Sequence, residues 1–189
     1  SGSGSNTLTF NYMIGSGQTA SDLDYVATSS LGGSSPDPGT PIYKDTNGNS
    51  DDVAINGDYI YVADGSSGLA IINISDPTNP GTPIYVNTND DAQAVSINGN
   101  YAFVADKTSG LAIIDISDPT SPGAPVYANT NGNAWDVEVR GNYAYVADDY
   151  TSGLAIIDIS NPASPGSPSY VSISGEARYI TIRGQYAYI

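Results

Sequence analysis

The chain has 189 residues, enough for one ordinary domain or one array of small repeats and too few for two large domains. Its 5 basic and 20 acidic residues give a net charge of −15. This charge excludes electrostatic binding to the phosphates of nucleic acid and disfavours binding to anionic membrane surfaces. No cysteine or histidine is present, so disulfides, Cys/His metal sites and imidazole catalysis are excluded. No apolar run approaches the roughly 20 residues that a membrane-spanning helix needs. The high content of glycine, proline and tyrosine is typical of an extracellular β-protein.

The first segment, residues 1–41, contains two short strand-like stretches, Asn6–Tyr12 and Ser21–Tyr25. These stretches resemble the later half of a bacterial Ig-like or cadherin-like adhesin module. The match spans only about thirty residues, whereas a complete sandwich needs several more strands. We therefore expect residues 1–41 to supply completing strands to another sheet, with an excursion over Gly15–Ser35.

Oxygen-bearing side chains alternate in the next segment, at Asp45, Asn47, Asn49 and Asp51. Such alternation occurs in calcium-binding loops, so these four residues are candidate calcium ligands. The segment lacks the later glutamate and the flanking helices of an EF-hand, and the equivalent segments further along the chain carry fewer carboxylates. An Asx-rich turn without metal is the favoured interpretation, because Asn and Gly form such turns by themselves. No other cofactor is predicted.

From residue 42 onward the sequence repeats with a period of about 42 residues. In the first repeat, turn residues separate four predicted strands, at Asp52–Asn56, Tyr59–Ala63, Leu69–Ile74 and Ile84–Asn87. The third strand is apolar on both faces, so both faces must be covered. The prediction is an all-β fold of four-stranded antiparallel blades, propeller-type or linearly stacked, with no helix. We place the repeats at residues 51–87, 92–129, 134–171 and, incomplete, 176–189.

One heptapeptide pattern marks the third strand of each complete repeat, at Leu69–Ser75, Leu111–Ser117 and Leu154–Ser160. Together with Gly141–Asp148 before its third copy, this pattern resembles the LVIVD repeat of bacterial and archaeal surface proteins. The resemblance covers residues 42–189. It implies β-propeller-like extracellular modules embedded in long secreted or cell-surface chains, and it brings no catalytic motif.

The fourth repeat has only two predicted strands, Glu176–Arg183 and Gln185–Ile189, which leave an unpaired edge. When the termini are joined in register, Leu8–Tyr12 takes the third-strand position and Ile42–Tyr43 the fourth-strand position. The fourth blade is therefore predicted to be split between the termini. Completion within one chain would give a four-bladed ring, and completion between chains the favoured head-to-tail fibre. The residues predicted to make this contact are Leu8, Phe10 and Tyr12 on one side and Tyr186, Tyr188 and Ile189 on the other.

An aspartate follows the second strand of each complete repeat, at Asp64, Asp106 and Asp148. Paired carboxylates serve glycosidases when they converge in a cleft. A residue repeated in every blade is more simply a turn former that bonds nearby backbone amides. Each repeat has an aromatic side chain at the same position of its second strand, and we expect it to pack between blades, with sugar binding as the alternative. These residues are Tyr61, Phe103, Tyr145 and Tyr188.

These features predict a non-enzymatic extracellular structural protein, a segment or subunit of a prokaryotic surface adhesin or fibre assembled through strand completion. Its expected partners are further copies of itself, head to tail, or neighbouring modules of a longer chain. The alternative is a glycan- or protein-binding β-propeller module of a cell-surface protein. An enzyme is the least favoured of the three classes.

Overall fold

The computed structural model describes residues 41–189, in which Lys44–Ile189 form one compact unit. The predictions for residues 1–40 lie outside the described residues. These include the Ig-like resemblance and the completing strand with Leu8, Phe10 and Tyr12. No helix among residues 41–189 is long and apolar enough to cross a membrane.

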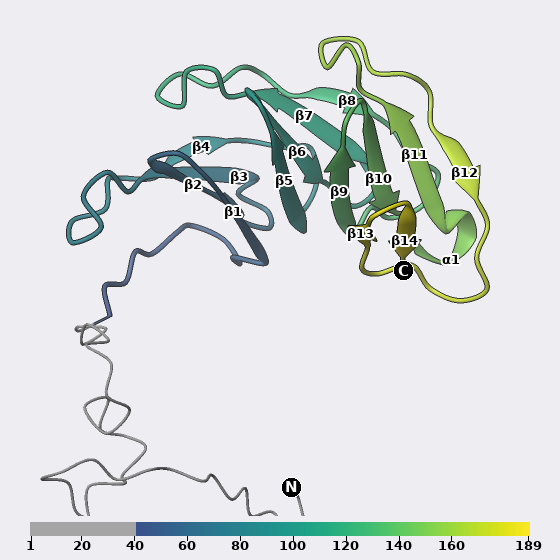
Figure 1. The fold of residues 1–189 in the computed structure, drawn as a ribbon. Helices are drawn as coiled ribbons and strands as arrows, with labels where there is room; N and C mark the ends of the chain where they lie inside the picture. The colour runs from purple at the N-terminus through teal and green to yellow at the C-terminus, as the bar shows by residue number, and fades with distance from the viewer. Residues whose placement is uncertain (1–40) are drawn as a thin grey trace, which may run out of the picture. The chain divides into compact units, whose positions relative to one another are not determined.

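Three four-stranded antiparallel sheets follow one another along the chain, each with its strands in sequence order (Figure 1). Blade 1 consists of β1 (Asp52–Asn56), β2 (Tyr59–Ala63), β3 (Leu69–Asn73) and β4 (Ile84–Val86). Blade 2 consists of β5 (Ala94–Asn98), β6 (Tyr101–Ala105), β7 (Leu111–Asp115) and β8 (Val126–Ala128). Blade 3 consists of β9 (Asp136–Arg140), β10 (Tyr143–Ala147), β11 (Leu154–Asp158) and β12 (Ser169–Val171). A two-stranded half-blade, β13 (Thr181–Arg183) and β14 (Tyr186–Tyr188), comes last, so the all-β prediction is confirmed.

Two local predictions need correction. One helical turn, α1 (Asp149–Ser152), occurs where no helix was expected, because the β10–β11 loop is one residue longer than its counterparts and the extra residue closes a turn. Ile42 and Tyr43 were predicted to take a fourth-strand position, yet they lie outside any strand, with 51% and 84% of their surface exposed. A fourth strand needs a third strand beside it, and none pairs with Ile42–Tyr43 in the described part of the chain.

The predicted turns form through local chemistry. Gly57 adopts a φ of +58° in the β1–β2 turn, a conformation that a residue with a Cβ adopts only at a cost. In the β3–β4 loop, Asp76 accepts hydrogen bonds from the backbone amide and the hydroxyl of Thr78, at 2.9 and 2.6 Å. The second repeat copies this arrangement at Asp118 and Thr120. The β3–β4 loop and its counterpart in blade 2 are therefore specified by residues of their own repeat.

The blades stack face to face, and the core lies between them. We call the face of a blade that looks toward the preceding repeat its leading face and the opposite face its trailing face. The trailing face of blade 1, with Leu69 and Ile71, packs on the leading face of blade 2, with Val104 and Ile114. Trailing-face residues of blade 2 pack on blade 3 in the same way, and those of blade 3 on the half-blade. Each fully buried Leu or Ile contributes about 1.5 to 3 kcal/mol, so stacking is the main source of stability.

The first strands of successive blades, β1, β5, β9 and β13, are neighbours. Side-chain carboxylates reinforce two of these junctions. Asp52 accepts a hydrogen bond from the Val95 amide at 2.8 Å, and Asp136 accepts one from the Ile180 amide at 2.7 Å. Burial raises the pKa of the Asp136 carboxyl, and the nearby charge of Asp52 adds to the rise. These strands therefore bring the acidic groups of different blades close together.

Candidate functional site

Each blade has two chemically different ends. The strand register places Asp52, Ala63, Leu69 and Val86 at one end of blade 1, which we call the loop end. The loops at this end join β2 to β3 and lead into the first strand of each blade. The opposite end, the turn end, carries the β1–β2 turns and the β3–β4 loops. The recurrent aspartates lie at the loop end.

Asp64 is fully buried and organises the loop that precedes β1. Its Oδ1 accepts hydrogen bonds from the hydroxyls of Thr46 at 2.5 Å and Ser50 at 3.2 Å. Its Oδ2 accepts one from the Gly48 amide at 2.8 Å. The aspartate does bind backbone amide, as predicted, but the partners lie 14 to 18 residues earlier rather than in its own turn. The aspartate therefore joins the loop after the second strand to the loop before the first strand.

Asp148 repeats this arrangement in blade 3, with the Thr130 hydroxyl on Oδ1 at 2.5 Å and the Gly132 amide on Oδ2 at 3.0 Å. Blade 2 differs, because Oδ2 of Asp106 accepts from the amides of Asn89 and Asp90 while its Oδ1 accepts no hydrogen bond among residues 41–189. Burial raises the pKa of the Asp106 and Asp148 carboxyls. Full burial in separate blades leaves neither carboxylate in a glycosidase-like cleft.

The four candidate calcium ligands, Asp45, Asn47, Asn49 and Asp51, are all exposed. The positions between them, at 46, 48 and 50, are the ones that converge, and they converge on Asp64. Within residues 41–189, no three acidic, imidazole or thiol groups are arranged to hold a metal ion. The geometry favours an Asx-rich turn built around a carboxylate.

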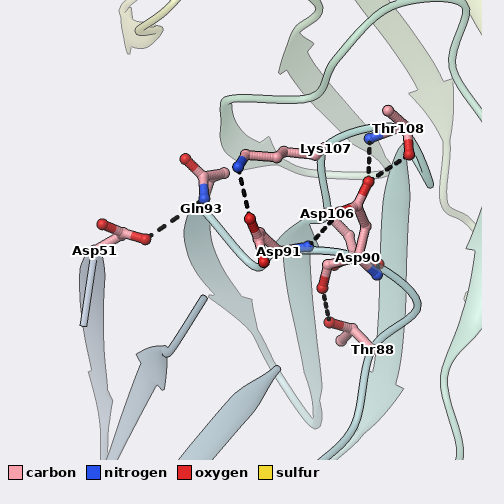
Figure 2. A network of polar contacts seen from close by, with 8 residues as sticks. All are labelled: Asp51, Thr88, Asp90, Asp91, Gln93, Asp106, Lys107 and Thr108. Atoms are coloured by element: carbon pink, nitrogen blue, oxygen red, sulfur yellow. Dashed lines mark hydrogen bonds and ion pairs between the residues drawn. The ribbon is translucent and has the colours of Figure 1, made fainter. Parts of the chain in front are cut away.

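Dissimilar side chains lie at the loop end, at equivalent positions that directly precede the first strand in blades 1, 2 and 3. In blade 1 this residue is Asp51, whose Oδ2 accepts a hydrogen bond from Nε2 of Gln93 in blade 2 at 3.5 Å (Figure 2). In blade 3 it is Trp135, and Arg178 follows in the half-blade with its guanidinium carbon 3.9 Å from the indole centroid. Lys107 Nζ lies 5.7 Å from the same centroid. We call these five residues the rim row.

Both cations of the rim row are paired with a carboxylate. Lys107 Nζ lies 2.7 Å from Asp91 Oδ2, beside the Asp90–Thr108 contacts in Figure 2. Arg178 forms an ion pair with Glu176. The Trp135 Nε1 atom is buried and has no hydrogen-bond acceptor among residues 41–189. The rim row therefore offers carboxylate and amide groups at Asp51 and Gln93, and an indole with two paired cations at Trp135.

The two ends of the stack expose apolar side chains. On the leading face of blade 1, Val53 and Ile55 are 57% and 66% exposed. On the half-blade, Tyr179, Tyr186 and Tyr188 are 80%, 71% and 55% exposed. The predicted packing between blades is correct for Tyr61, Phe103 and Tyr145 but wrong for Tyr188, because residues 41–189 contain no blade beyond the half-blade to cover it.

The predicted contact residues of the half-blade are therefore at the surface, and Ile189 is 47% exposed beside them. Two functional side chains were missed at the sequence level. Thr46 and Thr130, which donate to recurrent aspartates, stand at equivalent positions of the 42-residue repeat, and that spacing was a usable signal. Thr88, at the same position of blade 2, donates instead to the Asp90 carbonyl at 3.2 Å. No sequence signal indicated that cations lie over the Trp135 indole, because Lys107 and Arg178 come from two other repeats.

Comparison with known proteins agrees with this geometry. The profile described as the LVIVD repeat matches residues 47–88, 90–129, 131–171 and 174–189. Among solved structures, the chain is similar to the computationally designed Ika4 protein, with a TM-score of 0.61, 9% identity, and 76% of this chain and 86% of that chain covered. The computationally designed Ika8 protein matches with a TM-score of 0.58 and 9% identity over 73% of this chain and 41% of that one. No curated protein matches significantly. These structural likenesses concern the fold alone.

Proposed function

Since the chain belongs to the LVIVD repeat family and stacks its repeats as β-propeller-like blades, we propose that it is a non-enzymatic structural module of a prokaryotic surface protein. In this proposal the module extends head to tail into a fibre or adhesin stalk. The half-blade of one copy receives its missing third strand from Leu8–Tyr12 of the next. Blade 1 of that next copy then stacks on the completed blade.

One observation carries the proposal: the two exposed end faces are the two halves of a contact that the chain already makes inside itself. Trailing faces pack on leading faces between blades 1 and 2, between blades 2 and 3, and between blade 3 and the half-blade. The exposed Val53 and Ile55 occupy leading-face positions, and the exposed Tyr186 and Tyr188 occupy trailing-face positions. A heterologous contact of this kind extends without limit unless it closes into a ring.

The recurrent carboxylates support a structural role. Asp64, Asp106 and Asp148 are each buried and accept hydrogen bonds from the loops around them. These carboxylates hold the loops of the blades by hydrogen bonds, so we assign them no catalytic step. The exterior location in this proposal follows from the composition and the surface proteins in which such repeats occur, and secretion of a tagged chain by its host tests that location.

Analytical ultracentrifugation across a range of concentrations tests the assembly, with electron microscopy of the largest species. The chain should form longer species as its concentration rises, and added salt should strengthen the association because each copy carries a net charge of −15. Deleting residues 1–12 should leave monomers. A peptide of residues 6–12 added to the intact chain should cap growing ends.

Ile55→Lys places a charge on the leading face and should abolish elongation, whereas Ala163→Lys adds the same charge on an exposed loop residue outside both end faces and should leave it intact. Monomers at every concentration and salt level would contradict head-to-tail assembly. If those monomers lose stability when residues 1–12 are deleted, the ring form of completion holds instead.

A further inference from the structure

The repeats differ more at the loop end than at the turn end. At the turn end, the turn between the first two strands is Asn-Gly in blades 1 and 2 and Arg-Gly in blade 3 and the half-blade, and the Asp-Pro-Thr loop of blades 1 and 2 is Asn-Pro-Ala in blade 3. At the loop end, the equivalent residue of each repeat is an acid, an amide, an indole and a guanidinium in turn. Loops at both ends lie outside the stacked faces, so freedom from packing does not explain why the loop end varies more.

The backbone at three of these positions is held alike while the side chains change. The amides of Asp51, Gln93 and Trp135 donate to the carbonyls of Ala63, Ala105 and Ala147, each at 2.8 or 2.9 Å. Their side chains form two contact groups, Asp51 with Gln93 and Trp135 with Lys107 and Arg178. A common scaffold therefore presents three different functional groups in a fixed order, and Arg178 adds a fourth.

The loop end also accepts conformational strain to carry charged side chains. Blade 1 uses Gly65 at the second residue of its β2–β3 loop, with a φ of +53°. At the equivalent positions blade 2 has Lys107 at +40° and blade 3 has Asp149 at +60°. A non-glycine residue with positive φ costs about 1 kcal/mol or more, and such residues gather at functional sites. Stability alone would favour glycine at both positions.

We propose that the rim row is a binding surface for a neutral oligosaccharide. Vicinal hydroxyls of a sugar match the paired donors and acceptors of carboxylate, amide and guanidinium groups, which the rim row supplies at Asp51, Gln93 and Arg178. The N–H of Trp135 is buried and has no acceptor among residues 41–189, so a sugar hydroxyl would accept from it only once Arg178 or Lys107 moves off the indole.

Charge selects a neutral sugar over an anionic one. Lys107 and Arg178 are the cations of the strip, and both are paired with acids, Asp91 and Glu176. The protein as a whole carries a charge of −15, which repels sulfated and carboxylated glycans. The surface lies at the loop end, apart from the exposed Val53, Ile55, Tyr186 and Tyr188 used in head-to-tail assembly, so it is independent of that proposal.

Trp135 is the single tryptophan of the chain, so its fluorescence reports on this surface directly when excited where tyrosine does not absorb. The intact chain is first applied to an array of neutral, anionic and amino oligosaccharides. The strongest neutral trisaccharide is then titrated by fluorescence and by calorimetry. We expect saturable binding with a change in Trp135 emission.

Gln93→Ala should weaken the affinity about five- to tenfold, the loss of one good hydrogen bond to a ligand. Gln185→Ala, the same substitution in the exposed β13–β14 turn at the turn end, should leave the affinity unchanged. Circular dichroism of both variants checks that they fold alike. Three results would each overturn the proposal: no neutral sugar binds, only anionic or amino sugars bind, or Gln93→Ala binds as tightly as the unsubstituted chain.

Discussion

Gly110, in the β6–β7 loop, is a position where a single methyl group should damage the fold sharply. Its φ is +78°, and an added Cβ would lie 2.5 Å from the Thr130 amide nitrogen and 2.6 Å from the Ala128 carbonyl oxygen. Both neighbours are backbone atoms, so neither can swing aside as a side chain would. Gly110→Ala therefore forces the loop away from the segment that leads out of β8.

The expected loss has two parts. The left-handed conformation costs an alanine about 1 to 2 kcal/mol, and displacing packed backbone costs about 1 to 3 kcal/mol more, so we expect about 2 to 5 kcal/mol for Gly110→Ala. Gly99 is the matched control, since its φ is +58° and an added Cβ meets nothing within 4 Å. Gly99→Ala should lose only the first part, about 1 to 2 kcal/mol.

Equilibrium unfolding in urea, followed by far-ultraviolet circular dichroism, measures both losses in parallel. The midpoint of Gly110→Ala should fall well below that of Gly99→Ala while the two slopes stay alike. Equal losses for the two variants would refute the close approach of the β6–β7 loop to Ala128 and Thr130, because the left-handed conformation would then account for the whole effect.

Three further outcomes are expected. Leu111→Ala should lower the free energy of unfolding by about 2 to 5 kcal/mol, because Leu111 is fully buried between blades 2 and 3, and an unchanged urea midpoint would contradict the stacking. Asp148→Asn should cost about 1 kcal/mol more than Asp106→Asn in thermal or urea unfolding, because both oxygens of Asp148 accept hydrogen bonds and only one of Asp106 does; equal costs would argue against this difference. Burial raises the pKa of the Asp106 carboxyl above its ordinary 3.8, so its stabilising contribution is complete below pH 3.8 and is lost as pH rises through the raised pKa. The stability of the unsubstituted chain relative to Asp106→Asn should therefore decline over that pH range, and a rising difference would show the opposite sign of shift.

Residues close together in sequence determined what could be predicted at the sequence level. The apolar alternation of Leu69–Asn73 and the Asn56–Asp58 turn each act within a few residues, and they specify strands and hairpins wherever the 42-residue period repeats them. Because the pattern repeats, it also required both faces of each sheet to be covered, and hence stacked blades. The short α1 escaped prediction, since one inserted residue decides it.

The tertiary structure alone decided which side chains meet across repeats. The Thr46 hydroxyl reaches Asp64 over 18 positions, and Arg178 reaches the Trp135 ring from the following repeat. Such contacts depend on how far each blade is rotated and shifted against the next, and no local preference of the chain encodes that rotation. Stacking also left Val53 and Tyr188 exposed, because residues 41–189 form no further blade to cover either end face. The sequence by itself thus determined the blades and their order, and packing determined the contacts of the buried aspartates, the rim row and the two exposed end faces.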